Sequence, residues 1–117
     1  MTVEYRCDPI EQAAINASRI TVTPIINNFP IDARGGSDKS DMAPQPLTLW
    51  WRSVSVETDL PSFEKSDQPR GFIRSRSIAR RFYVDSGAKA GDVVVFEKLG
   101  SHEYRLHLEK SNGRRIS

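Results

Sequence analysis

The run RGFIRSRSIARRFY at residues 70–83 carries the side chains best suited to chemistry in this chain. An arginine guanidinium presents a planar fork of donors that matches both phosphate and the edge of guanine. The run holds no acidic residue, and the net charge of the whole chain is only +2. The positive charge is therefore local, and it predicts an anionic partner, with phosphate backbones the first choice. The arginines of the run are Arg70, Arg74, Arg76, Arg80 and Arg81.

The remaining residue types argue against catalysis and against a cofactor. One cysteine, Cys7, and two histidines, His102 and His107, are too few by themselves for a zinc site. Each Glu-Lys pair is adjacent, so its side chains would point to opposite faces of a strand, unlike the Glu-x-Lys of metal-dependent nucleases. We expect Cys7 to be an ordinary buried or half-buried thiol and both histidines to be solvated. The sequence therefore predicts no enzyme activity and no metal or other cofactor.

Length and composition limit the class of protein. A chain of 117 residues with 38% hydrophobic residues is expected to form one domain, residues 1–117, with a modest core. No apolar stretch approaches the roughly 20 residues of a spanning helix, and no secretory signal is visible. The single cysteine leaves no intrachain disulfide and fits a reducing compartment. We therefore expect a cytoplasmic protein that does not contact a membrane.

Hydrophobic periodicity predicts two short helices and six or seven strands. Asp8-Pro9 is typical of a helix start and predicts a helix over residues 8–17. Ser77 is expected to cap a second helix, which Gly87 ends. Alternating or β-branched runs predict strands at residues 19–23, 47–51, 53–58, 72–74, 92–97 and 104–109.

Loops and terminal segments complete the expected architecture. Residues 27–46 and 60–69 contain the turn-forming residues of loops, with a short helical turn near residues 29–33. Residues 1–18 are expected to form an N-terminal helical extension, and residues 110–117 a flexible tail. Many short strands with turn signals predict a mainly β fold, a small open β-barrel (pseudobarrel) of about seven strands with two short helices.

The arginines of this run could contact DNA in two ways, at base edges and at phosphates. We expect Arg74 and Arg76 to alternate in an extended segment, so that both project from one face and reach base edges. Arg80 and Arg81 lie in the following helix, in position to hold the phosphate backbone. The alternative is a solvated basic face with no ligand.

A longer segment, FIRSRSIARRFYVDSGAKAGDVVVFEKLGSHEYRLHL, resembles the DNA-binding pseudobarrel of plant B-three transcription-factor domains. It is more similar still to the effector, target-recognition domains of EcoRII-like bacterial restriction endonucleases. The shared pattern is a basic arm, a helix that ends in Phe82-Tyr83, a linker, Gly91-Asp92 and a β-branched strand. The runs ITVTPIINN, FPIDARGGSDKSDMAP and LTLWW followed by VETD extend the similarity over most of residues 18–109.

In such domains two arms grip the major groove of double-stranded DNA, so the resemblance implies which residues bind. One arm would match Asn27-Asn28, and the other would match residues 70–77. The resemblance implies base contacts from Asn28, Arg74 and Arg76, and phosphate contacts from Arg81 and Lys39. Together with the arginines above, the predicted DNA-binding residues are Asn27, Asn28, Lys39, Arg70, Arg74, Arg76, Ser77, Arg80 and Arg81.

The sequence also departs from the family's pattern. Phe29-Pro30 follows Asn28 directly, so the first arm is expected to be short, and Ser77-Ile78 stands where the pattern tends to have Gly-Trp. The accompanying nuclease domain is absent from these residues. The leading interpretation is therefore a sequence-specific double-stranded DNA-binding domain of restriction-endonuclease type without its own nuclease.

A second interpretation belongs to a different class of protein. The chain would be a protein-interaction or specificity subunit of a restriction-modification system, with weak or no DNA binding and a nuclease or methyltransferase subunit as its partner. The oligomeric state stays open in both interpretations. Single-stranded nucleic acid is disfavoured as a ligand, because only 9% of residues are aromatic and most of them are expected in the core.

Overall fold

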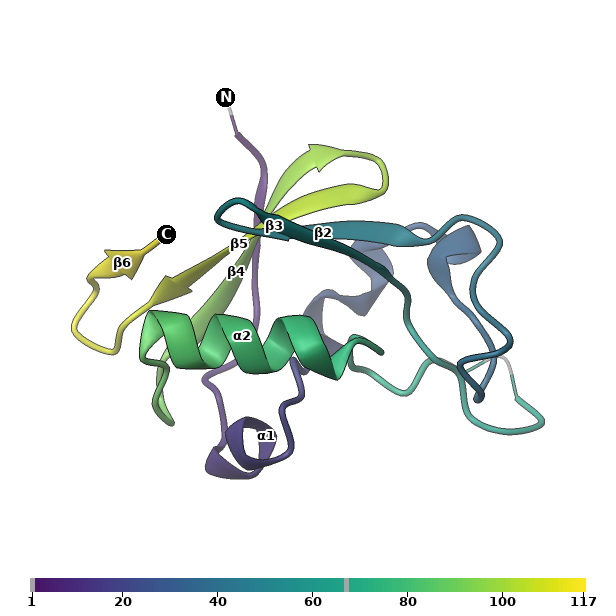
Figure 1. Cartoon of the computed structure of the whole chain (residues 1–117), viewed down its shortest axis with the longest axis horizontal. Coiled ribbons are helices and arrows are strands. Elements are labelled where there is room, and N and C mark those ends of the chain that lie inside the picture. The colour runs from purple at the N-terminus through teal and green to yellow at the C-terminus, as the bar shows by residue number, and fades with distance from the viewer. Residues whose placement is uncertain (1, 67) are drawn as a thin grey trace.

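Residues 2–66 and 68–117, the part of the chain described by the computed structural model, form one mixed β-sheet with a few short helices (Figure 1). The strands are β1 (Glu4–Arg6), β2 (Leu47–Trp51), β3 (Val54–Thr58), β4 (Val93–Gly100), β5 (Glu103–Glu109) and β6 (Arg115–Ile116). The helical elements are α1 (Gln12–Asn16), the 3₁₀ turns η1 (Thr23–Asn28) and η2 (Ile31–Ala33), and α2 (Arg76–Ser86).

The strands follow the order β1-β4-β5-β2-β3, with β6 paired to β5. β2 and β5 run parallel, and the other pairs are antiparallel. The mainly β prediction is confirmed, but the described residues form six strands in an open sheet and not about seven strands in a barrel. The difference arises because residues 19–23 and 72–74 are not strands of the sheet; they meet each other in a single bridge between Thr21 and Phe72.

The apolar face of the sheet supplies most of the core. β2 buries Leu47, Leu49 and Trp51 in strict alternation, as its sequence predicts. The predicted strands at 53–58 and 104–109 are confirmed as β3 and β5, and the strand expected at 92–97 continues to Gly100 as β4. Trp50, on the other face of β2, is half-buried and donates a hydrogen bond of 2.7 Å to the Glu103 carboxylate.

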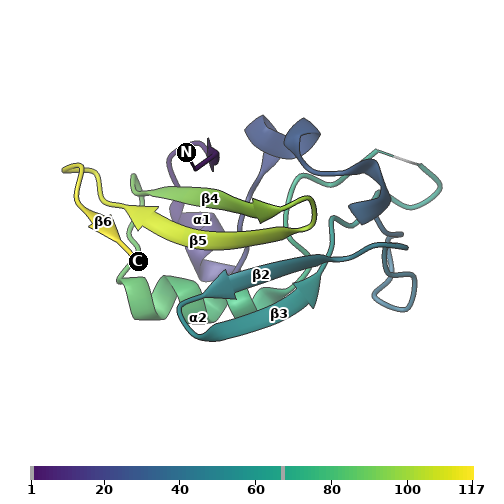
Figure 2. The ribbon, with the colours of Figure 1, turned by 90° about the horizontal axis from the view of Figure 1, so that it is seen from above.

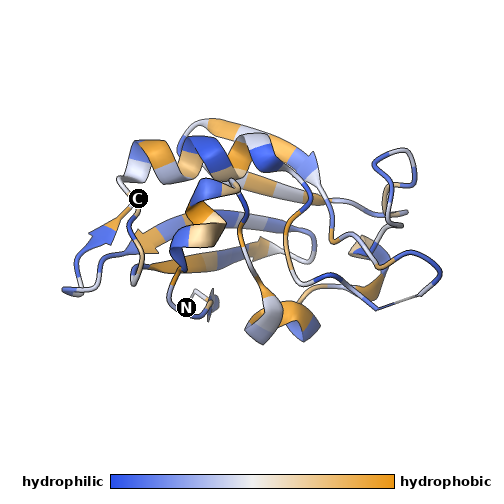
Figure 3. Ribbon diagram, turned by 90° about the horizontal axis from the view of Figure 1, so that it is seen from below, coloured by the Kyte–Doolittle hydropathy of each residue, from blue (hydrophilic) through white to orange (hydrophobic). Residues whose placement is uncertain are grey.

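Helix α2 packs on the sheet through one apolar stripe. The Trp51 and Phe82 rings meet edge to face, with their centroids 4.8 Å apart. Figure 3 shows hydrophobic and hydrophilic residues alternating around this helix, as expected for one buried and one exposed face. The buried stripe consists of Ile78, Ala79, Phe82, Tyr83 and Ser86.

The ends of α2 explain how the segment before it is placed. Ser75 is the N-cap, and its side-chain oxygen accepts a hydrogen bond from the Ile78 amide, 3.4 Å away. The expectation that Ser77 caps the helix was therefore wrong by two residues. Gly87 ends the helix as predicted, in the left-handed conformation with φ of 67°.

Both termini differ from their expected structures because they pair with the sheet. The predicted helix at 8–17 is reduced to α1, since the Cys7 and Ile10 amides donate to the Val94 and Asp92 carbonyls and keep this stretch extended. Just before it, β1 pairs with β4. The tail expected to be flexible contains β6, which pairs with the end of β5.

Two elements that matter for the site lie over different parts of the sheet. Figure 2 shows η1 and α2 on opposite sides of the molecule. In agreement with that view, η1 contacts β1, at one edge of the sheet, whereas α2 contacts β2. Neither of these elements, nor any other helix in residues 2–66 and 68–117, combines the length and apolar character needed to cross a membrane.

Candidate nucleic-acid interface

The two arms predicted from the sequence start from chain segments that are hydrogen-bonded to each other. The Val22 amide donates to the Gly71 carbonyl at 2.8 Å, and the Ile73 amide donates to the Ile20 carbonyl at 3.1 Å. This short antiparallel ladder holds the chain before η1 against the chain before α2. From there the two segments diverge towards opposite sides of the molecule (Figure 2).

The residues of the first arm lie apart from the arginines of α2. Asn27 and Asn28 are exposed at the end of η1, on the far side from α2. Lys39 is exposed in the loop after Gly35-Gly36. None of Asn27, Asn28 and Lys39 lines the groove that contains the helical arginines, and their roles in DNA binding stay predictions.

Arg74 makes its contacts inside the protein. Its side chain is 14% exposed and forms an ion pair with Asp59, whose side chain is fully buried. The Arg74 Nη2 also donates to the Gly36 carbonyl at 2.6 Å, and Asp59 accepts a further hydrogen bond from the Ala43 amide. Arg74 therefore ties the glycine loop to the segment before α2, instead of presenting its guanidinium to solvent.

Arg76 lies in a different element from the one expected. Because Ser75 caps the helix, Arg76 is the first residue of α2 and not part of an extended arm shared with Arg74. Arg76 and Ser77 therefore lie in the same helix as Arg80 and Arg81, each four residues before one of these arginines. Residues at that spacing lie on one side of a helix, and all four are exposed.

These four residues line a groove of about 760 Å³ between α2 and the end of the α1 region. No carboxylate of residues 2–66 and 68–117 lies within 4.0 Å of the Arg76 or Arg80 guanidinium. Arg81 approaches Asp85 only to 3.8 Å, and its side chain stays 58% exposed. We call this surface the α2 groove; its lining is Arg76, Ser77, Arg80, Arg81, Val84, Asp85, Ala17 and Ser18.

Arg70 is not part of the α2 groove lining and belongs to a chain of stacked cations and aromatic rings. Its Cζ lies 5.1 Å from the centroid of Phe72 and 5.8 Å from that of Phe63. The Cζ of Arg19 lies 4.3 Å from the Phe72 centroid. Sequence reasoning missed Arg19, Phe63 and Phe72, because their proximity depends on the ladder between residues 19–23 and 70–74.

A second group of arginines joins β1, β5 and β6 through side-chain contacts at the end of the sheet. Arg115 contacts Glu4 at 2.7 Å and Glu109 at 2.6 Å, and Arg6 contacts Glu109 at 2.6 Å. Hydrogen bonds from Arg6 and Arg115 lower the pKa of Glu109 to about 2. We call these four residues the sheet-end cluster; its charges neutralise one another in place.

The two histidines did not both lie in solvent as expected. His107 is buried, with its Nε2 2.7 Å from Glu97 Oε1 and its Nδ1 2.6 Å from Ser117 Oγ. The prediction failed because the paired C-terminal segment covers this part of β5. His102 is half-buried and lies 2.7 Å from an Asp32 carboxylate oxygen.

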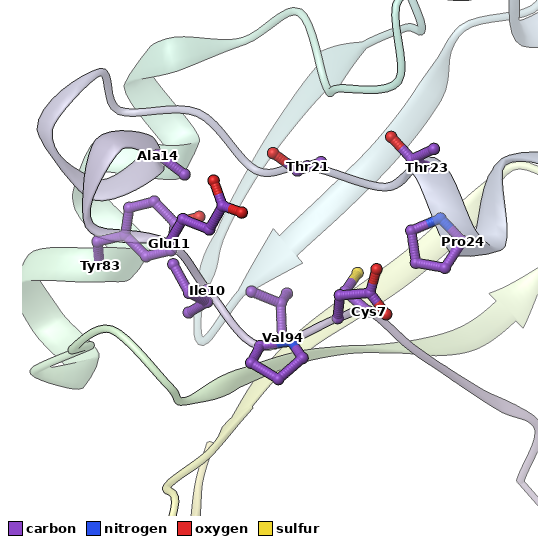
Figure 4. A pocket seen from close by; sticks show the side chains of 11 residues that line it. Cys7, Ile10, Glu11, Ala14, Thr21, Thr23, Pro24, Tyr83 and Val94 are labelled. Carbon is purple, nitrogen blue, oxygen red and sulfur yellow. The ribbon is translucent and has the colours of Figure 1, made fainter.

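A smaller cavity of about 190 Å³ lies beside β1 and α1 (Figure 4). Cys7, Glu11 and Tyr83 are among its lining residues. Cys7 is buried as predicted, and burial, with a contribution from Asp8, raises the pKa of its thiol to about 12. The thiol is therefore protonated at neutral pH and is a poor nucleophile.

Within the described residues, no three histidine, cysteine, aspartate or glutamate side chains come together to hold a metal ion. No protein-family model matches the chain, and no curated protein matches its sequence.

Proposed function

We propose that this chain binds double-stranded DNA through the α2 groove. The observation that carries the proposal is a set of exposed arginines along one side of α2. Among the described residues, Arg76 and Arg80 have no carboxylate within 4.0 Å, and Arg81 has only Asp85, at 3.8 Å. Three arginines in one groove supply the several cations that a phosphate backbone requires. Arg76, Arg80 and Arg81 would hold phosphates, with Ser77 as a further donor.

Arg70 extends this basic surface. It lies on the segment that leads into α2 and is exposed. Its guanidinium would contact the same strand of DNA beyond the groove. Arg74 would act as a positioning residue, because its ion pair with Asp59 fixes the segment between Arg70 and the start of α2.

For the recognition of a particular DNA sequence, we propose the two-armed mode of the pseudobarrel family that the chain resembles. In that proposal, residues 70–77 form one arm and Asn27-Asn28 a short second arm. Because the two arms diverge from the shared ladder, the Asn27-Asn28 arm would contact DNA at a site distinct from the α2 groove. The protein would be a recognition domain of restriction-endonuclease type, with no cleavage of its own.

The test is fluorescence anisotropy with a labelled random duplex library, titrated at several salt concentrations. Four phosphate contacts predict a slope of log K against log salt of about −3 to −4. Failure to bind at low salt, or a slope near zero, would overturn the proposal. Co-purification with a nuclease or methyltransferase subunit, together with no binding to duplexes, would favour the protein-interaction alternative.

A further inference from the structure

A second groove, of about 710 Å³, lies between the loop of residues 31–44 and the loop of residues 62–66. Its lining includes three of the six large hydrophobic side chains that are exposed among the described residues: Ile31, Met42 and Phe63. Hydrophobic side chains scattered singly on a surface need no explanation, but three that converge on one groove indicate a ligand with an apolar part.

Phe63 lines this groove, and its backbone makes two hydrogen bonds. The Phe63 amide donates to the Gln68 carbonyl at 2.9 Å, and the Ser66 amide donates to the Phe63 carbonyl at 3.2 Å. The residue is 53% exposed. An exposed aromatic side chain on the wall of a groove is suited to stacking against another flat ring.

The polar groups of the groove suit a phosphate and a base edge. Arg34 and Lys65 are its cations, and the Arg34 Nε is buried without a hydrogen-bond partner among the described residues. Asp41 supplies a carboxylate acceptor on the same lining. A ligand with a planar apolar ring, an amino group and an anionic phosphate would satisfy all three kinds of group.

We propose that this groove binds a single unpaired nucleotide. Its base stacks on Phe63 against Met42, its exocyclic amine donates to Asp41, and its phosphate pairs with Arg34 or Lys65. The nucleotide is either a free mononucleotide or an unpaired nucleotide of a DNA strand. The second form rests on the proposed function, because Arg70, 5.8 Å from the Phe63 ring, connects the groove to the surface that leads to α2.

Met42 makes the proposal directly testable, because the chain contains only two methionines. With ¹³C-methyl methionine, we expect the Met42 signal to move when deoxyadenosine monophosphate is added, owing to the ring current of the base. Ribose 5-phosphate, which lacks a base, should leave it in place. An unmoved Met42 signal at millimolar nucleotide, or an equal shift with the sugar phosphate, would overturn the proposal.

Variants of Phe63 separate stacking from simple contact. Phe63→Leu keeps an apolar side chain but should abolish the nucleotide-induced shift, whereas Phe63→Tyr should retain it. Leu99→Ala, which removes an exposed hydrophobic side chain elsewhere, is the matched control and should have no effect. A shift that survives in Phe63→Leu would contradict the assignment of the ring as the stacking surface.

DNA ligands then distinguish the two sources. If the nucleotide belongs to DNA, a duplex with one bulged adenine should bind on the order of tenfold more tightly than the fully paired duplex, and Phe63→Leu should remove that preference. Equal affinity for both duplexes, with a Met42 shift from the mononucleotide, assigns the groove to free nucleotides. Binding of the paired duplex without any Met42 shift would overturn this inference and leave the proposed function standing. A Met42 shift with the mononucleotide, without binding of any duplex, would overturn the proposed function and leave this inference standing.

Discussion

The α2 groove and the sheet-end cluster both hold arginines, but they use them in opposite ways. In the cluster, Arg115 and Arg6 each lie within 2.7 Å of a glutamate oxygen. Along α2, the closest charge pair of the groove is that of Arg81 and Asp85, at 3.8 Å. The two arginines of the cluster are neutralised by two glutamates, whereas the three arginines of the groove face one aspartate, so an added anion meets excess positive charge only in the groove.

Arg74 shows the same difference within the arginine-rich run itself. It is separated from Arg76 by one residue, yet it is paired and largely buried, whereas Arg76 is exposed. The partner of each arginine, more than its place in a basic run, therefore decides whether it can contact a ligand.

Arg74→Ala should be the most destabilising of these changes. It leaves the fully buried Asp59 carboxylate without its cation, which typically costs about 3–5 kcal/mol of unfolding free energy. Urea unfolding followed by tryptophan fluorescence measures the loss. The double variant Arg74→Ala/Asp59→Ala should recover part of it, and a single variant as stable as the wild type would show that the pair is not structural.

Arg80→Ala should weaken DNA binding without weakening the fold. Loss of one phosphate contact is expected to reduce affinity on the order of tenfold for every duplex tested, and to lower the magnitude of the salt slope by about 1. Because the side chain is exposed, the unfolding free energy should change by less than about 0.5 kcal/mol. Arg114→Ala, an exposed arginine in the C-terminal segment, is the control and should bind like the wild type.

Arg115→Ala should show the reverse pattern. The change removes contacts to Glu4 and Glu109 at the surface, so we expect a loss of about 1 kcal/mol in unfolding free energy. DNA affinity of the folded protein should be unchanged. A tenfold loss of affinity in Arg115→Ala would indicate that DNA binds the sheet-end cluster and not the α2 groove.

Glu109→Gln should flatten the dependence of stability on pH. The pKa of Glu109 is lowered from the ordinary 4.5 to about 2, so its contribution is complete above pH 4.5 and is lost as the pH falls to about 2. Unfolding free energies of the wild type and the variant should therefore converge in that interval. A constant difference from pH 6 to pH 2 would exclude Glu109 as a source of the acid sensitivity.

Much of the fold could be predicted because its signals are local. The alternation in residues 47–51 and 104–109 specifies which side chains face the core, and these strands were placed correctly. β1 and β6 have three and two residues, and such short segments become strands only because β4 and β5 offer an edge. The start of α2 was misplaced because Ser75 and Ser77 are equally good caps by residue type.

The site was less predictable, because its decisive contacts join distant residues. Asp59 lies fifteen positions before Arg74, and nothing in the intervening sequence indicates that they meet. The stacking of Arg19 on Phe72 likewise depends on a ladder between distant segments. Charge patterning singles out residues 70–83, but only the tertiary structure separates the paired arginine from the exposed ones.

The most direct test of the central claim compares two charge-matched variants in one experiment. Arg76→Ala/Arg80→Ala removes two charges from the α2 groove, and Arg6→Ala/Arg115→Ala removes two from the sheet-end cluster. In duplex binding across a salt series, the groove variant should lose about two from the magnitude of the salt slope, while the cluster variant keeps the wild-type slope. Equal slopes for the two variants would contradict the account, because binding would then follow total charge and not the α2 groove.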